Sequence, residues 1–131
     1  MGDGLVRVAV GFAIASMVFA APAEADYLPF VSPSQNISCE VDYQRDKVPD
    51  VAFCATNTPP ESATLDDTGV LSTCSGENCV GNAPQNSPTL AFGKTTASGP
   101  FTCRSEVDSV TCTVTSGRGF SISSSGITPV G

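Results

Sequence analysis

The stretch Phe101-Thr-Cys-Arg-Ser-Glu-Val-Asp-Ser-Val-Thr-Cys-Thr-Val114 decides the fold. On both sides of Val107–Asp108, apolar residues and cysteines occupy every second position, which is typical of two antiparallel strands joined by a tight turn. Folding the chain at that turn places Cys103 directly opposite Cys112. Residues opposed in a non-hydrogen-bonded pair lie about 4.5 Å apart at Cα, which is within reach of a disulfide. The same register predicts two further pairs, Phe101 with Val114 and Ser105 with Val110.

The chain continues with Thr115-Ser-Gly-Arg-Gly-Phe-Ser-Ile-Ser123, which predicts a third strand. A turn at Ser116-Gly-Arg118 would bring Phe120 opposite Val114 and Ile122 opposite Cys112. We therefore predict a C-terminal three-stranded meander with one apolar face.

The rest of the chain is rich in Gly, Pro, Ser, Thr and Asn, and no window shows a sustained helical period. We predict an extended first segment over 27–34 and short strands over 37–41, 51–55, 70–73 and 89–92. We expect irregular structure over 56–67, where at most one helical turn forms, and loops over 42–50 and 74–88. These patterns together predict an all-β fold, a small disulfide-stapled antiparallel sandwich or a partly open barrel of short strands.

Six cysteines in a short chain indicate a disulfide framework. Strand register favours Cys103–Cys112, and Cys39–Cys54 would close the other hairpin. If Cys39 faces Cys54, however, Val51 and Phe53 point to the opposite face, so either that face is covered too or a bulge shifts the register. Elimination then leaves Cys74–Cys79. A zinc site is a poor alternative because the chain has no histidine and no Cys-x2-Cys spacing.

Residues 1–25 have the three parts of a secretory signal peptide. The apolar part, Val8–Ala20, would form a helix of about 20 Å at about 1.5 Å per residue, which is too short to anchor the chain in a membrane. We predict cleavage after Ala23 or Ala25, with Ala25 preferred; an uncleaved amphipathic helix is the alternative. Residues 26–131 would then form a single secreted β-rich domain, extracellular or in the cell envelope, with no membrane contact after cleavage.

Charge narrows the classes of partner. The chain has a formal charge of −7, and loss of Arg7, Asp3 and Glu24 with the leader would make it −6. Without a basic patch, nucleic acid is a poor partner, and the same sign disfavours docking on anionic membranes. The chain contains no Trp, so we expect a thin core that depends on its crosslinks.

No catalytic constellation emerges from the motifs. Asp67-Thr-Gly69 matches the triplet of aspartic proteases, but a polar turn explains it equally well. A carboxylate pair could hydrolyse a glycoside, yet nothing selects a pair from Glu40, Asp42, Glu61, Asp66, Asp67 and Glu77. The acidic loop 42–50 lacks the Asp-x-Asp-x-Asp spacing of a calcium site. We assign no catalytic residue, no metal site and no cofactor.

Two loops are candidates for recognition, because loops on a stapled scaffold often carry it. Gly117, Arg118 and Gly119 would present one exposed cation on a tight hairpin, although turn glycines with a solvated arginine are the simpler interpretation. The second is Ser75–Asn78, between the cysteines of the smallest loop. Asn36-Ile-Ser38 is a glycosylation sequon, but we expect Asn36 to support the turn before the next strand.

Several motifs in order resemble a known family: Phe30-Val-Ser-Pro-Ser-Gln-Asn-Ile-Ser-Cys39, Leu90-Ala-Phe-Gly93, Gly99-Pro-Phe-Thr-Cys103, Val110-Thr-Cys112 and Gly117-Arg-Gly-Phe-Ser-Ile-Ser123. The chain is similar to an uncharacterised family of small exported domains of unknown function, mostly from mycobacteria and related actinobacteria. The family often has Gly-His-Gly-Phe and Ile-Ser-Arg near its end, whereas this chain has Arg118 and Ser124 at the corresponding positions. The resemblance implies export, disulfides and β structure, and it carries no assigned activity.

We therefore expect a secreted, monomeric, non-catalytic module that binds an unknown protein or cell-envelope ligand. A secreted inhibitor or effector that contacts a protein through a rigid loop is one alternative. A small carboxylate-dependent hydrolase is the other.

Overall fold

The computed structural model describes residues 26–81 and 85–131. The predicted signal peptide, with both candidate cleavage sites, lies outside these residues. No helix in the described ranges is long and apolar enough to span a membrane.

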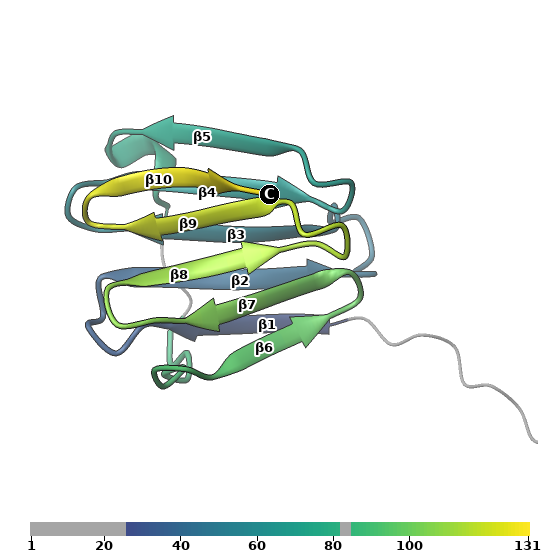
Figure 1. Ribbon diagram of the computed structural model, residues 1–131, viewed down its shortest axis with the longest axis horizontal. Coiled ribbons are helices and arrows are strands. Elements are labelled where there is room, and N and C mark those ends of the chain that lie inside the picture. Colours follow the sequence, from purple (N-terminus) through teal and green to yellow (C-terminus); the bar gives the residue numbers. More distant parts are fainter. Residues whose placement is uncertain (1–25, 82–84) are drawn as a thin grey trace, which may run out of the picture.

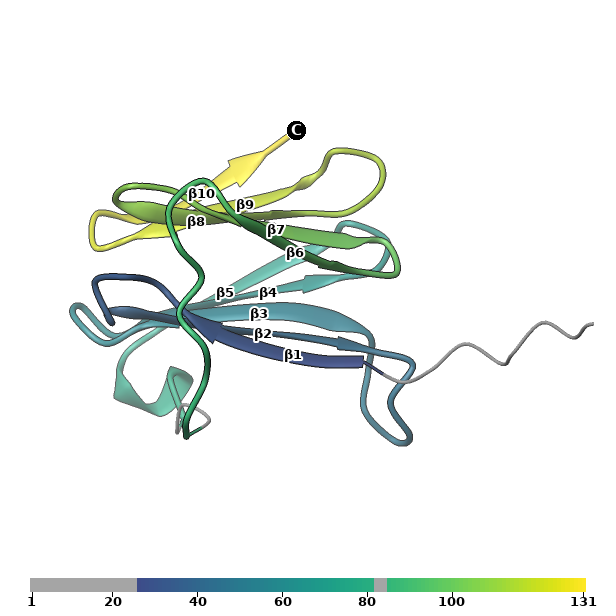
Figure 2. The same cartoon turned by 90° about the horizontal axis from the view of Figure 1, so that it is seen from below.

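The fold is a sandwich of two five-stranded antiparallel sheets (Figures 1 and 2). The first sheet has its strands in chain order: β1 (Asp26–Val31), β2 (Ile37–Tyr43), β3 (Val51–Thr56), β4 (Glu61–Asp66) and β5 (Leu71–Ser75). The second is also a meander, with strands β6 (Thr95–Ser98), β7 (Phe101–Ser105), β8 (Ser109–Thr113), β9 (Gly119–Ser123) and β10 (Gly126–Val130). The all-β, disulfide-stapled prediction is confirmed, and the three C-terminal strands it named are the centre of the second sheet.

Alternation along the strands supplies the core between the sheets. In β7 the buried residues are Phe101, Cys103 and Ser105, while the residues between them are exposed. Strands β2, β3 and β4 contribute the facing layer, which is built mostly of small side chains: Cys39, Val41, Ala52, Cys54, Ala63 and Leu65. Because many of these side chains are Ala or Cys, the apolar area buried per residue is modest. Small side chains also let the two sheets lie close enough for their disulfides to come into contact.

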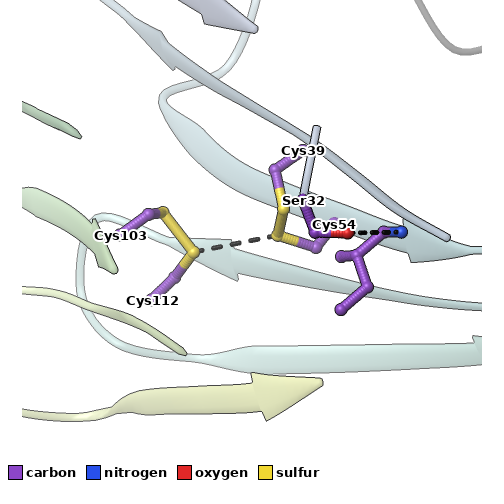
Figure 3. Close-up of a disulfide and its surroundings, with 6 residues drawn as sticks. Ser32, Cys39, Cys54, Cys103 and Cys112 are labelled. Atoms are coloured by element: carbon purple, nitrogen blue, oxygen red, sulfur yellow. Dashed lines mark hydrogen bonds between the residues drawn. A yellow bond between two sulfur atoms is a disulfide. The ribbon is translucent and has the colours of Figure 1, made fainter. Parts of the chain in front are cut away.

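Two disulfides meet at the centre of the sandwich (Figure 3). Cys39–Cys54 bridges β2 and β3, and Cys103–Cys112 bridges β7 and β8, each between directly opposed residues whose Cα atoms lie 4.0 Å apart. The Sγ atoms of Cys54 and Cys112 are 3.8 Å apart. Since both sulfurs are in disulfides and carry no proton, this is a packing contact, and it joins one sheet to the other.

The third disulfide, Cys74–Cys79, lies outside the core. It ties β5 to the short 3-10 helix η3 (Glu77–Cys79). Residues 85–94 cross to the second sheet along the edge of β1, where Val31 N–H donates to Pro88 O and Leu90 N–H donates to Val31 O. This crossing covers one end of the edge strand, and Figure 2 shows it running across both layers. The three disulfides are the pairs that the sequence predicts.

The ambiguity at the first hairpin resolves without a bulge. Cys39 pairs with Cys54 and Glu40 with Phe53 in an unbroken ladder. Phe53 and Val51 therefore lie on the outer face of the first sheet, where both are partly buried. Of the two alternatives that the sequence leaves open, the structure therefore has the one in which the outer face is partly covered, and the register is not shifted.

Two local predictions are wrong, and two edge strands have no prediction. Residues 61–66 form β4 and are not irregular, because their small and apolar side chains alternate against β3. Residues 89–92 form only an isolated bridge, Thr89 with Val31, because Gly93 turns the chain directly afterwards. The edge strands β6 and β10 are absent from the predictions: β6 is short and has only one buried residue, and β10 contains Pro129, which an edge strand tolerates.

The register of the last hairpin also differs from the prediction. Cys103–Cys112 and Ser105–Val110 pair as expected, but Phe120 lies opposite Cys112 and Ile122 opposite Val110. The turn is centred one residue earlier than predicted, which moves the pairing by two residues and keeps the same face inward. Phe120 and Ile122 are consequently still fully buried.

Candidate functional site

The predicted contact loop is the β8–β9 turn, at the end of the sandwich where the chain also ends (Figure 1). Val114 N–H donates to Arg118 O (2.9 Å), and Gly117 N–H donates to Val114 O (2.8 Å). Three residues, 115–117, therefore close the hairpin, and Gly117 takes a φ of 92°, a left-handed conformation that glycine adopts without strain. This geometry leaves Arg118 exposed at the start of the returning strand.

Gly119, which follows that arginine, lets strands β8 and β9 approach closely. A Cβ at residue 119 would lie 1.9 Å from the carbonyl oxygen of Cys112 and 2.7 Å from the Cα of Thr113. Strands β8 and β9 can approach this closely only because residue 119 has no side chain. The requirement for glycine at 119 is therefore steric, and the turn interpretation accounts for both glycines of the motif.

Arg118 lines a groove of about 330 Å³ between the open edges of the two sheets. The first sheet contributes the β4–β5 turn and the start of β5, and the second contributes β10 and the residue after it. The lining consists of Gly69, Val70, Leu71, Arg118, Gly119, Pro129, Val130 and Gly131. A groove of this volume is within the range of small-ligand sites.

The β4–β5 turn gives the groove its shape. Asp66 accepts hydrogen bonds on one carboxylate oxygen from Thr68 Oγ1 (2.7 Å) and from the backbone N–H groups of Thr68 and Val70 (2.9 Å each). These bonds, the one from the Thr68 hydroxyl first, lower the pKa of Asp66 below its usual value. The protease-like triplet Asp67-Thr68-Gly69 is therefore part of a polar turn held by Asp66.

Gly69 brings the two walls together. A Cβ placed on it would lie 3.2 Å from Arg118 Cβ and 3.5 Å from Arg118 Cδ. The aliphatic stem of Arg118 consequently packs over the turn of the opposite sheet, and the residue lines the groove.

The guanidinium of Arg118 forms no ion pair or hydrogen bond with any side chain of residues 26–81 and 85–131. Arg45 contrasts with it, because Arg45 is paired with Asp42 and lies 4.5 Å above the Tyr27 ring. Beside Arg118, Val70 is 53% exposed. The groove therefore combines an unused cation with apolar walls, in a chain whose overall charge is negative.

A second cluster of charged groups lies on the outer face of the first sheet. Glu40 and Asp42 are two residues apart on β2 and share this face, and Tyr27 pairs with Asp42 across β1. Burial between Pro29 and Phe53, its cross-strand neighbours, is the main cause that raises the pKa of Glu40 to about 7; its hydrogen bond with Asp42 adds to the shift. Burial also raises the pKa of Tyr27.

This cluster is the only place where two of the six candidate carboxylates interact within the described part of the chain. Asp66 and Asp67 lie in the β4–β5 turn, Glu61 begins β4, and Glu77 is in η3. Asp42 is buried and already bound to Arg45. One member of the Glu40–Asp42 pair is therefore unavailable to a substrate, which disfavours the hydrolase hypothesis.

The other two predicted features lie elsewhere. Ser75–Asn78 and the Cys74–Cys79 disulfide are at the far end of β5 from Arg118, so the two candidate contact loops do not form one surface (Figure 1). Asn36 ties two turns together: its Nδ2 donates to Thr58 O (3.1 Å) and its Oδ1 accepts from Thr58 N–H (3.0 Å). This bears out the structural role expected of Asn36.

The sequence indicates Arg118 as a contact residue but not the other residues that line the groove. Val70 is predicted in a strand, whereas it precedes β5, and no element is predicted over 126–130, which form β10. The alternation of Ile127 and Pro129 was the available signal, and the proline obscured it.

Comparison with known proteins found no matching family model, no similar curated protein and no similar solved structure. Within 26–81 and 85–131, no group of three or more metal-binding side chains comes together.

Proposed function

We propose that this protein is a secreted, non-catalytic binding module that acts in the cell envelope or outside the cell, and that it contacts its partner through the Arg118 groove. The ligand feature we assign to the groove is a carboxylate or other anion next to an apolar group. The observation that carries this proposal is the guanidinium of Arg118, which has no partner among residues 26–81 and 85–131, while its stem packs over Gly69 and the residue lines the groove.

Charge gives the groove its selectivity. The chain as a whole repels anions, so an anionic partner would gain attraction only close to an exposed cation such as Arg118. Such an interaction is screened at moderate salt, because the Debye length is about 8 Å at physiological ionic strength. The proposal therefore predicts binding that weakens with added salt, while the apolar contact to Val70 and Pro129 persists.

Export is supported by the disulfides. Three disulfides are typical of proteins that mature in an oxidising compartment, and the leader pattern and the family resemblance support the same location. The proposed state is a monomer with no cofactor.

Capture on the immobilised domain tests the proposal. The Arg118→Gln variant keeps the length and polarity of the side chain and removes its charge, so it should lose the partner captured from cell-envelope or host extracts. The matched control is Lys47→Gln, which removes an exposed cation from the β2–β3 loop, outside the groove, and should leave capture unchanged.

A third variant, in which Gly-Ser residues replace Ser75–Asn78, tests the other candidate loop. Retention of every captured partner by Arg118→Gln would overturn the proposal, and a loss in the 75–78 variant would then assign the contact to the other loop. The identity of the captured molecule separates an envelope ligand from a protein target of an inhibitor or effector.

A further inference from the structure

The opposite end of the sandwich has a larger groove, with different chemistry. It measures about 410 Å³ and is formed where the β1–β2, β7–β8 and β9–β10 turns converge (Figure 2). Its lining is dominated by hydroxyl groups: Ser34, Asn36, Ile37, Val107, Asp108, Ser123, Ser124 and Ser125. Strand β8 separates this end from Arg118, so the groove is independent of the site proposed above.

A second depression of about 260 Å³ adjoins the first at Val107. Phe92, Gly93 and Arg104 are among its lining residues. Phe92 is 50% exposed and Val107 is 70% exposed, although both are large apolar side chains. The two depressions therefore form one surface, with an aromatic ring at one end and a row of serines at the other.

The polar groups of this surface are of two kinds. Some are fixed: Asn36 is bound to Thr58, Ser34 Oγ accepts from Asn36 N–H, and Glu106 accepts from Thr111 Oγ1. Others have no hydrogen bond or ion pair within the described residues, namely the side chains of Arg104, Asp108, Ser124 and Ser125. The fixed groups hold the turns, and the others remain available to a ligand.

These available groups match a sugar better than an ion. A carboxylate accepts from two neighbouring hydroxyls, a guanidinium donates to two oxygens, and a serine does either. An aromatic ring beside them provides a flat apolar surface for the C–H face of a pyranose or furanose ring. Arg104 offsets only one of the two carboxylates of this surface, Asp108 and Glu106, so its formal charge is −1 and it offers no attraction to an anionic ligand.

We propose that the Phe92–Ser125 surface is a binding site for a neutral oligosaccharide. Phe92 and Val107 contact a ring face, and Arg104, Asp108, Ser124 and Ser125 bind hydroxyl groups. The two adjoining depressions accommodate more than one sugar unit, so a chain binds better than a monosaccharide.

NMR titration of the 15N-labelled protein tests this proposal. The probes are four neutral tetrasaccharides, built of glucose in α-1,4 linkage, glucose in β-1,4 linkage, mannose and arabinose. At least one should shift the amide signals of Val107, Asp108, Ser124 and Ser125 and leave those of Gly69 and Arg118 in place. Phe92→Ala should weaken that binding about tenfold, and Asp108→Asn should weaken it as well.

Matched controls keep the test decisive. Asp67→Asn removes an exposed turn carboxylate at the other end of the sandwich and should leave the affinity unchanged, as should Arg118→Gln. Comparison of each variant's amide spectrum with that of the wild type identifies a variant that does not fold. If Phe92→Ala does not fold, Phe92→Leu replaces it, because leucine keeps an apolar side chain and removes only the aromatic ring. The absence of shifts with all four probes, shifts confined to the Arg118 end, or an unchanged affinity in the Phe92 variant would each overturn the proposal. Preference of the same residues for a cationic glucosamine or an anionic glucuronate tetramer would also overturn it.

Discussion

Removal of the Cys103–Cys112 disulfide should cost far more stability than removal of Cys74–Cys79. The double variant Cys103→Ala/Cys112→Ala opens a loop with a sequence separation of nine, for which the chain-entropy model gives about 2.6 kcal/mol. Both sulfurs are fully buried, and each lost sulfur leaves a void of about methyl size at about 1 kcal/mol. The expected loss is therefore about 4–5 kcal/mol, a large share of the 5–15 kcal/mol typical of a domain.

The comparison variant is Cys74→Ala/Cys79→Ala. Its loop has a sequence separation of five, which corresponds to about 2 kcal/mol, and because Cys74 is exposed, truncation creates no cavity there. Urea unfolding followed by circular dichroism, without reductant, gives both values; the chain has no Trp for fluorescence. If the two double variants lose equal stability, or if Cys103→Ala/Cys112→Ala loses less than the surface pair, the buried disulfides do not hold the sheets as we describe.

Three further outcomes follow from the structure. Glu40 has a folded-state pKa of about 7 against an ordinary value of 4.5, so between these pH values the native state retains a proton that the unfolded chain releases. The contribution of Glu40 to the free energy of unfolding is therefore complete below about pH 4.5 and is lost as the pH rises to 7. Glu40 is only partly buried and solvent screens it, so we expect about 1 kcal/mol, measured as the difference in pH dependence between wild type and Glu40→Gln; parallel pH profiles would contradict this. Gly119→Ala should lose about 3 kcal/mol in thermal unfolding because its Cβ would overlap the Cys112 carbonyl, whereas Ser121→Ala on the same strand should stay within about 0.5 kcal/mol; equal melting temperatures would refute the close approach. In a timed reaction with dithiothreitol, alkylation and peptide mapping should find Cys74 and Cys79 reduced first, since the other four cysteines are buried; early labelling of Cys103 would contradict the packing.

The parts of the fold that could be predicted are those where one local signal was supported by another. At 101–112, strand alternation, a two-residue turn and a pair of cysteines all required the same register, and the structure has it. At 116–122 no cysteine fixed the register, so a one-residue error in the turn moved Phe120 past its true partner Cys112. Register that depends on a turn alone is weakly specified, because glycine turns of neighbouring lengths are similar in sequence.

Strand β4 and the two grooves could not be predicted from local sequence because they depend on contacts between segments that are distant in the chain. The prolines before Glu61 suggested irregular structure, yet pairing with β3 on one side and β5 on the other makes the segment a central strand. The grooves are formed by turns from both sheets, and no local pattern says that Gly69 lies under Arg118 or that Val107 adjoins Phe92. Single residues such as Arg118 could be selected from sequence, but their surroundings depend on how the sheets stack.

Photocrosslinking from inside the Arg118 groove is the most direct test of the functional account. A benzophenone side chain at position 70, in the wall beside Arg118, should form a covalent adduct with the partner, and the adduct should disappear when Arg118→Gln is added. The same group at Thr102, exposed on the outer face of β7, should form none. Adducts of equal yield from positions 70 and 102, or an adduct at 70 that survives Arg118→Gln, would show that the protein does not bind its partner through this groove.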